Sequence, residues 1–273
     1  MKKIHIGAGS ILKAVFVTLI TNPVILYPFF LLGFIQLLLL EIIYFVPRYP
    51  LSGFFSLIIT KTAGPVFLHY PFNYLLLSKW FHGVEAFIAI FISCIFYGAA
   101  VLIISLVDSG KPVILKKVFQ QVFSSYIHLV TAMILATVLF QGLVFLFGLV
   151  LKKALLVWLT LYLQWFLACI VTALLAFVVP IIILEQKNII TAVKLNFTNF
   201  SRLIPLMLGA VIVSGLLYLP FIFLRSTQTN EMILKAPEMF GLLLVLAVLM
   251  MLLISAIQYT AITLGYLLVK ESS

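Results

Sequence analysis

The chain has 273 residues, of which 65% are hydrophobic and only 9% are charged. A soluble domain is roughly half apolar and a quarter charged, so this composition excludes a water-soluble globular fold and indicates an integral membrane protein. The net charge of +10 comes from lysines and arginines that lie mostly between apolar runs, which favours anionic lipid headgroups over nucleic acid as a partner.

Six apolar stretches are long enough to cross a bilayer, since a spanning helix needs about 20 mostly apolar residues. In chain order they cover residues 23–46, 83–107, 128–150, 154–179, 202–224 and 240–268. The segment 64–81 is shorter and contains His69, Asn73 and Lys79, so we expect an interfacial loop there. The sequence therefore predicts an all-α integral membrane fold, with about six transmembrane helices in one domain.

Three segments outside the spans, residues 10–21, 111–126 and 187–200, have one apolar and one polar face at helical periodicity. A short helix of this kind lies in the headgroup plane with its apolar face towards the acyl chains. The expected apolar stripe of the last segment consists of Ile189, Val193, Phe197 and Phe200. The candidate contacts to anionic lipid are Lys116, Lys117, Lys187 and Lys194. The alternative is that these lysines only set the topology.

The three segments also resemble one another in sequence. Ser10-Ile-Leu-Lys-Ala-Val-Phe matches Val113-Ile-Leu-Lys-Lys-Val-Phe, and Asn188-Ile-Ile-Thr-Ala-Val-Lys matches both more loosely. Because two spans follow each segment, the pattern predicts three repeats of an interfacial helix and a transmembrane hairpin. The predicted repeat units are residues 9–107, 110–179 and 186–269. Shared composition of amphipathic helices is the alternative.

Six spans would place the three segments and both termini on the same side of the membrane. Lysine and arginine are more frequent on that side than on the other. By the positive-inside rule, we expect a protein of the cell membrane with both termini in the cytoplasm.

A pattern at residues 179–197 resembles a known family. Val179-Pro180-Ile-Ile-Ile-Leu-Glu185 precedes Ile189-Ile-Thr-Ala192-Val-Lys-Leu-Asn-Phe197. The stretch is similar to one in prokaryotic polytopic membrane proteins of unknown function, related to the membrane domain of some glycerophosphodiester phosphodiesterases. Gln186 and Asn196 stand where those proteins usually have glycine and serine. The resemblance implies a six-span membrane fold and transfers no catalytic residues.

Pro180 and Glu185 also have a structural interpretation. Pro180 lacks a backbone donor and is expected to end the fourth span. Glu185 would then precede the next helix, where its charge suits the positive end of the helix dipole. A coupling or partner-binding role is the alternative for both residues.

Polar residues inside the spans are candidate functional sites because charges are costly in a bilayer. Glu41 and Glu85 are expected near the outer boundary. There, snorkelling to water competes with a proton or substrate site and with a structural ion pair. Four glutamines are interpreted as hydrogen-bonding groups between helices, and a polar substrate pathway is the alternative. They are Gln36, Gln141, Gln164 and Gln258.

Three classes of function remain. No metal-ligand spacing, phosphate-binding loop or nucleophile motif is present, so we expect no cofactor, and an enzyme acting on lipid ranks last. The first hypothesis is a non-enzymatic membrane module that binds anionic phospholipid or a membrane protein partner. The second is a transporter or channel for a small or lipid-like solute. Against it, no pair of glycine- or proline-broken spans is evident at matching positions.

Overall fold

The computed structural model describes residues 8–151, 157–200, 204–217, 219 and 235–272, and the regular elements in them are all helical. The expected all-α class is thus confirmed. Four helical stretches are long and apolar enough to cross a membrane, and a bent helix pair is a fifth if it counts as one span. The four are Pro23–Phe45, Tyr126–Gly148, Tyr162–Glu185 and Pro237–Lys270, and the pair is Gly83–Phe91 with Ser93–Asp108. The chain is a membrane-embedded helical protein.

The sixth expected span, residues 202–224, is described only in part. Helix α11 (Ile204–Leu216) covers its first half, and most of the second half lies outside the described residues. The expected loop at 64–81 is wrong in its second half. Helix α4 (Asn73–Phe91) already begins at Asn73 and continues towards the bend, so this polar stretch is helical and not a loop.

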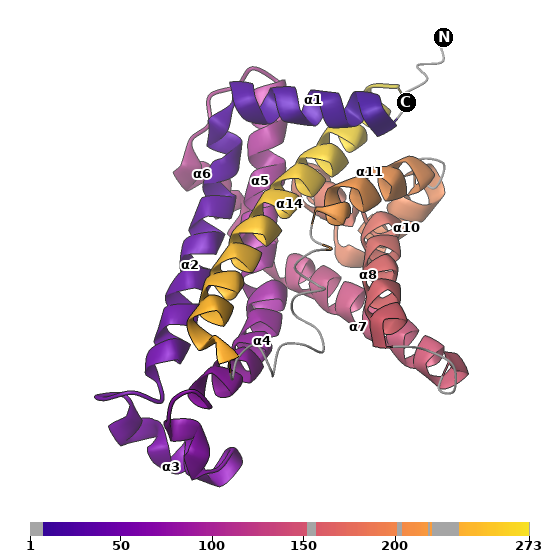
Figure 1. Cartoon of the computed structure of the whole chain (residues 1–273). Helices are drawn as coiled ribbons and strands as arrows, with labels where there is room; N and C mark the ends of the chain where they lie inside the picture. Colours follow the sequence, from indigo (N-terminus) through magenta and orange to yellow (C-terminus); the bar gives the residue numbers. More distant parts are fainter. Residues whose placement is uncertain (1–7, 152–156, 201–203, 218, 220–234, 273) are drawn as a thin grey trace.

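The long helices form two groups (Figure 1). Helices α2 (Tyr27–Phe45), α5 (Ser93–Asp108) and α14 (Pro237–Ser272) pack on one another, and α4 leads into α5. Helices α7 (Tyr126–Leu151) and α8 (Val157–Leu174) pack together, and α11 packs against both α8 and α14. The shorter elements are α1 (Ala8–Thr21), η1 (Pro23–Leu26), α3 (Ser52–Thr62), η2 (Pro65–Leu68), α6 (Leu115–Ser124), α9 (Val178–Glu185) and α10 (Ile189–Phe200).

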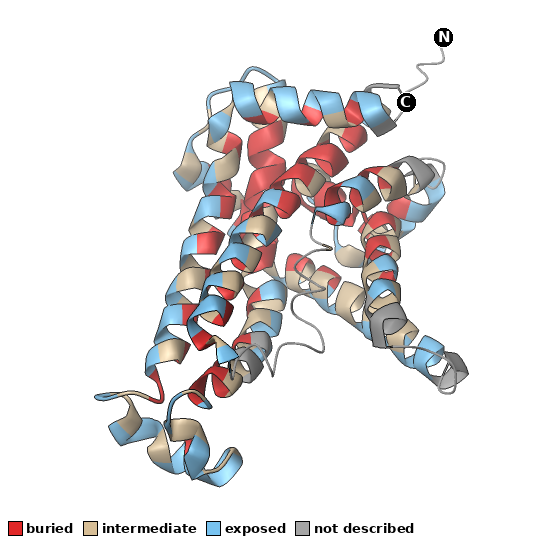
Figure 2. Cartoon of the chain, in the orientation of Figure 1, coloured by how far each residue is buried: buried red, intermediate tan, exposed pale blue. Residues whose placement is uncertain are grey.

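Helix α5 lies at the centre of the largest apolar cluster (Figure 2). Gly98 allows this close packing, since a Cβ there would lie 3.1 Å from Leu129 Cδ1 of α7 and 3.2 Å from methyl groups of Val122 and Ile183. Without a hydrophobic driving force in lipid, small residues that let helices approach closely are a main source of helix association. Gly98 therefore brings α5 against α6, α7 and α9 together.

Helices α1, α6 and α10 all pack against this same cluster, to which they contribute Val15, Val118 and Ala192. The apolar stripes were expected to face acyl chains. The most buried residues of these helices instead face the protein, because the ends of α5, α9 and α14 offer an apolar surface beneath them.

The burial pattern agrees with the repeat alignment for α1 and α6 but not for α10. The aligned residues Val15 and Val118 are both buried, whereas α10 buries Ala192 and Asn196, one position before the aligned Val193 and Phe197. The expected stripe of α10 is therefore rotated by one residue. The three-repeat organisation stays a prediction.

Candidate functional site

The four predicted lipid-contacting lysines are all exposed. Lys116 and Lys117 lie in the first turn of α6, Lys194 lies in α10, and Lys187 lies in the connection from α9 to α10. Helices α6 and α10 also each have an exposed apolar side chain: Phe123 of α6 is 57% exposed and Ile190 of α10 is 79% exposed. Helix α1 has the same combination, with Lys13 and Ile20 exposed.

The polar residues of α6 attach this helix to the end of α9. Gln121 Nε2 donates to the Ile183 carbonyl oxygen at 3.3 Å, and Ser125 Oγ donates to Gln186 Oε1 at 3.4 Å. Gln186 adopts φ 53° at the end of α9, and its amide donates to the same Ile183 carbonyl at 2.8 Å. The Ile183 carbonyl near this helix end thus accepts hydrogen bonds from two side chains. Helix α6 is thus held in place with Lys116 and Lys117 exposed.

Pro180 does not end the fourth span. Helix α8 stops at Leu174, and α9 restarts at Val178 with Pro180 in its first turn. The break lies one turn before the proline because its ring clashes with the carbonyl of residue Ala176 and it has no N–H to donate there. The span then continues to Glu185, so the expected end at 179 is corrected.

Asn196, which is fully buried, satisfies the backbone at this break. Its Oδ1 accepts from the Phe177 N–H at 3.1 Å, and its Nδ2 donates to the Leu174 carbonyl oxygen at 2.7 Å. This requirement explains the rotated face of α10. The break between α4 and α5 has a similar device, since the Tyr126 hydroxyl donates to the Phe91 carbonyl oxygen at 3.1 Å.

Glu185 is the last residue of α9 and lies four residues before the start of α10, so its expected interaction with the positive end of the next helix stays a prediction. Its Oε1 accepts a hydrogen bond from the Tyr266 hydroxyl of α14 at 2.5 Å. A carboxylate at a helix C-terminus meets an unfavourable dipole, and this charge-assisted hydrogen bond offsets it. The side chain next to the start of α10 is that of Asn188, whose Oδ1 accepts a hydrogen bond from the Thr191 N–H at 2.9 Å as an N-cap.

The two candidate acids do not line one site. Glu41 is exposed on α2 and lines a groove with Tyr44, Leu77 and Gly241. Glu85 is half-buried on α4 and is not part of that lining. None of the cavities described here is lined by both acids.

The end of the molecule near this groove has contacts of its own. Arg48 lies over the Tyr44 ring, 3.6 Å from its centroid, and the Tyr70 hydroxyl donates to Glu238 Oε1 at 2.8 Å. That hydrogen bond raises the pKa of Tyr70, because it stabilises the protonated phenol beside a carboxylate. The Tyr70 hydrogen bond attaches the segment before α4 to the start of α14.

The four glutamines differ in burial. Gln36 is buried on α2, Gln164 and Gln258 are half-buried, and Gln141 is exposed on α7. None of them is among the residues that line the cavities described here. A shared polar pathway therefore has no support from these residues, and their role between helices stays a prediction.

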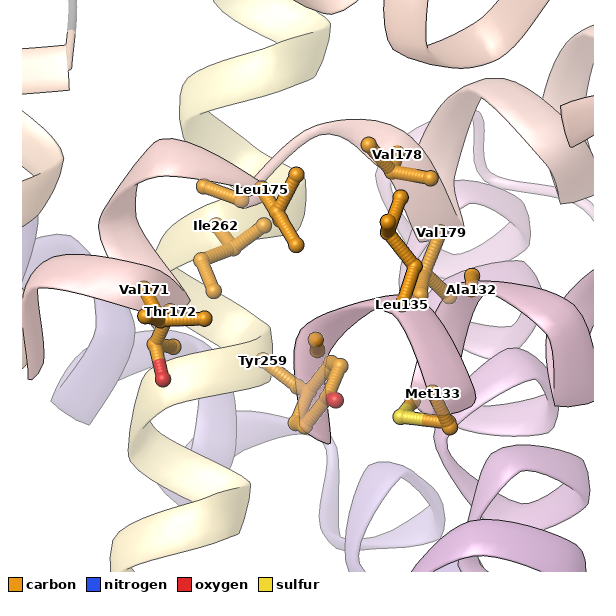
Figure 3. A pocket seen from close by; sticks show the side chains of 12 residues that line it. Ala132, Met133, Leu135, Val171, Thr172, Leu175, Val178, Val179, Tyr259 and Ile262 are labelled. Carbon is orange, nitrogen blue, oxygen red and sulfur yellow. The ribbon is translucent and has the colours of Figure 1, made fainter. Parts of the chain in front are cut away.

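A cavity of about 120 Å³ lies beside the second break, between α7, α8, α9 and α14 (Figure 3). Leu175 and Val178 flank it on either side of the break, and Tyr259 and Met133 enter from α14 and α7. Its lining is apolar except for the hydroxyls of Tyr259 and Thr172, and the latter already donates to the Ala168 carbonyl at 2.8 Å. The cavity suits an apolar group and contains no acid–base pair.

Sequence reasoning missed the residues whose side chains hydrogen-bond to backbone groups at the two helix breaks, above all Asn196 and Tyr126. Asn196 was noted in the sequence only as a departure from the resembled family, with no structural role. The usable signal was its position four residues after Ala192, which places a polar amide on the same face of α10 as Ala192, in the helix that follows a proline-containing span.

Among the described residues, no group of three or more His, Cys, Asp or Glu side chains could hold a metal ion. Comparison with protein families, with curated proteins and with solved structures gives no match for this chain. The resemblance to the phosphodiesterase-associated membrane family therefore stays a prediction, and a functional conclusion has to come from the geometry.

Proposed function

We propose that the chain is a non-enzymatic membrane module that binds anionic phospholipid through α1, α6 and α10. The observation that supports this most directly is the division of α6 into two sides. Val118 and Val122 are buried against the spans, while Lys116, Lys117 and Phe123 are exposed. Exposed lysines beside an exposed aromatic ring suit the boundary between phosphate headgroups and acyl chains.

The three helices would lie at the cytoplasmic boundary of the cell membrane, with both termini on that side. The exposed lysines of α1, α6 and α10 would then face the anionic leaflet. A membrane protein partner with an acidic surface is the second occupant that this arrangement would accept.

The test exchanges Lys116, Lys117, Lys187 and Lys194 for glutamine. Purified protein in zwitterionic nanodiscs is titrated with phosphatidylglycerol, and bound lipid is counted by native mass spectrometry. Each basic residue near an anionic lipid surface contributes roughly 1 kcal/mol, so we expect about a hundredfold weaker binding or more for the four-lysine variant.

The matched control exchanges Lys61, Lys79, Lys152 and Lys153, four lysines that the sequence places on the other side of the membrane. It removes the same charge and should change binding by less than about threefold. Equal losses in both variants, or no preference of the unmodified chain for anionic lipid, would contradict the proposed function.

A second candidate, movement of a lipid-like solute, is favoured by the two broken spans. Broken helices line binding sites in many transporters, and the second break borders the apolar cavity. Replacing Ala176 with leucine would fill that cavity. Slower transfer of a fluorescent lipid between the leaflets of proteoliposomes would support transport, whereas protein-independent transfer would remove the idea.

A further inference from the structure

A groove of about 330 Å³ lies between the end of α5 and the start of α6. Its lining combines two lysines and one glutamine with five apolar residues. They are Lys111, Lys117 and Gln121, and Leu102, Leu106, Pro112, Ile114 and Val118. Both lysines are exposed, whereas Leu102 and Val118 are buried, so charge lies at the surface and apolar side chains lie beneath.

The backbone at the end of α5 fixes the position of Lys111. Gly110 adopts φ 64°, its N–H donates to the Val107 carbonyl at 3.0 Å, and the Lys111 N–H donates to the Leu106 carbonyl at 2.8 Å. These two bonds form a Schellman motif, which turns the chain sharply after the helix. Pro112 then leads the chain into α6, so the connection forms one wall of the groove.

The other wall is equally well defined. Val118 is buried in the central cluster, and Gln121 is attached to α9 through the Ile183 carbonyl. Lys117 projects from this anchored helix one residue before Val118. The groove therefore does not depend on a mobile element for its shape.

We propose that this groove holds the headgroup phosphate and glycerol region of one anionic phospholipid, which deepens and rests on the proposed function. Lys111 and Lys117 would pair with the phosphate, and the apolar wall of Leu106 and Ile114 would contact the first part of an acyl chain. Charge complementarity and the five apolar residues argue together for a lipid, because an inorganic anion would leave the apolar wall unused.

The sharpest test compares Lys117→Gln with Lys116→Gln. The two lysines are adjacent and exposed on one helix, but only Lys117 lines the groove. In zwitterionic nanodiscs titrated with phosphatidylglycerol, Lys117→Gln should weaken the tightest bound lipid about fivefold, and Lys111→Gln with Lys117→Gln about thirtyfold. Lys116→Gln should stay within about twofold of the unmodified chain.

A further variant tests the apolar wall. Ile114 is 47% exposed and occupies the N-cap of α6, where serine is a favoured residue, so Ile114→Ser should fold normally and still weaken lipid binding. Unchanged lipid binding in Ile114→Ser would overturn the acyl-chain contact.

The outcomes separate this site from the broader function. A chain that prefers phosphatidylglycerol but loses binding equally in Lys116→Gln and Lys117→Gln would overturn the groove and leave the proposed function standing. No preference for anionic lipid at all would overturn both. Displacement of the lipid by inorganic phosphate at equal concentration would identify a simple anion site and overturn the phospholipid assignment.

Discussion

Two broken spans in the described part of the chain are held in different ways. Between α4 and α5 the axis bends by 42°, and the Phe91 carbonyl oxygen accepts a hydrogen bond from the Tyr126 hydroxyl. Between α8 and α9, the Asn196 amide accepts from the Phe177 N–H and donates to the Leu174 carbonyl. At the first break a hydroxyl group donates one hydrogen bond to the backbone, and at the second break a side-chain amide makes two.

Proline accounts for the difference. Pro180 removes a donor and displaces the preceding carbonyl, whereas no proline lies between Pro71 and Pro112 around the first break. Lipid offers no water to replace a lost backbone hydrogen bond, so the break before the proline, which has three non-helical residues, needs a side chain that is both donor and acceptor. Both side chains come from the segment that follows the span, which attaches α6–α7 and α10 to the broken helices.

The largest expected effect is at the second break. Asn196→Ala removes two hydrogen bonds, to the half-buried Leu174 carbonyl and to the buried Phe177 N–H, at roughly 1–3 kcal/mol each, so we expect about 2–6 kcal/mol of lost stability. Unfolding in mixed detergent micelles measures it. Thr198→Ala, at an exposed position on the same helix, is the control and should be nearly neutral. Equal stability of the two variants would show that Asn196 does not satisfy the break.

The first break should be less sensitive. Tyr126→Phe removes one hydroxyl hydrogen bond and keeps the ring, so the expected loss is about 1 kcal/mol in the same unfolding experiment. Tyr162→Phe, which changes a 42% exposed tyrosine on α8, serves as the control. A loss of stability in Tyr126→Phe as large as that in Asn196→Ala would contradict the weaker dependence of the first break on its side chain.

The smallest effect is a coupling between Pro180 and Asn196. In a Pro180→Ala background, α8 can continue further towards α9 and satisfy part of its own backbone. The cost of Asn196→Ala should then fall by about 0.5–1.5 kcal/mol in a double-mutant cycle. Strict additivity of the two substitutions would show that the proline is not the cause of the break.

Apolar length predicted most of the spans, because a run of about 20 apolar residues has few alternatives to a membrane helix. The break before Pro180 and the helical start at Asn73 were missed, since both depend on which neighbours supply hydrogen bonds. The exposed lysines followed directly from helical periodicity. The groove at Lys111 and Lys117 could not be predicted, because it requires the turn at Gly110 to bring α6 back against α5.

The most direct measurement is accessibility labelling of single cysteines in sealed, oriented vesicles. Lys117→Cys and Lys194→Cys report on α6 and α10, and the native Cys94 and Cys169 are buried, which keeps background labelling low. A membrane-impermeant maleimide should label both new cysteines from one side, and Lys61→Cys only from the other. Labelling of positions 117 and 194 from opposite sides would contradict a shared lipid-binding boundary.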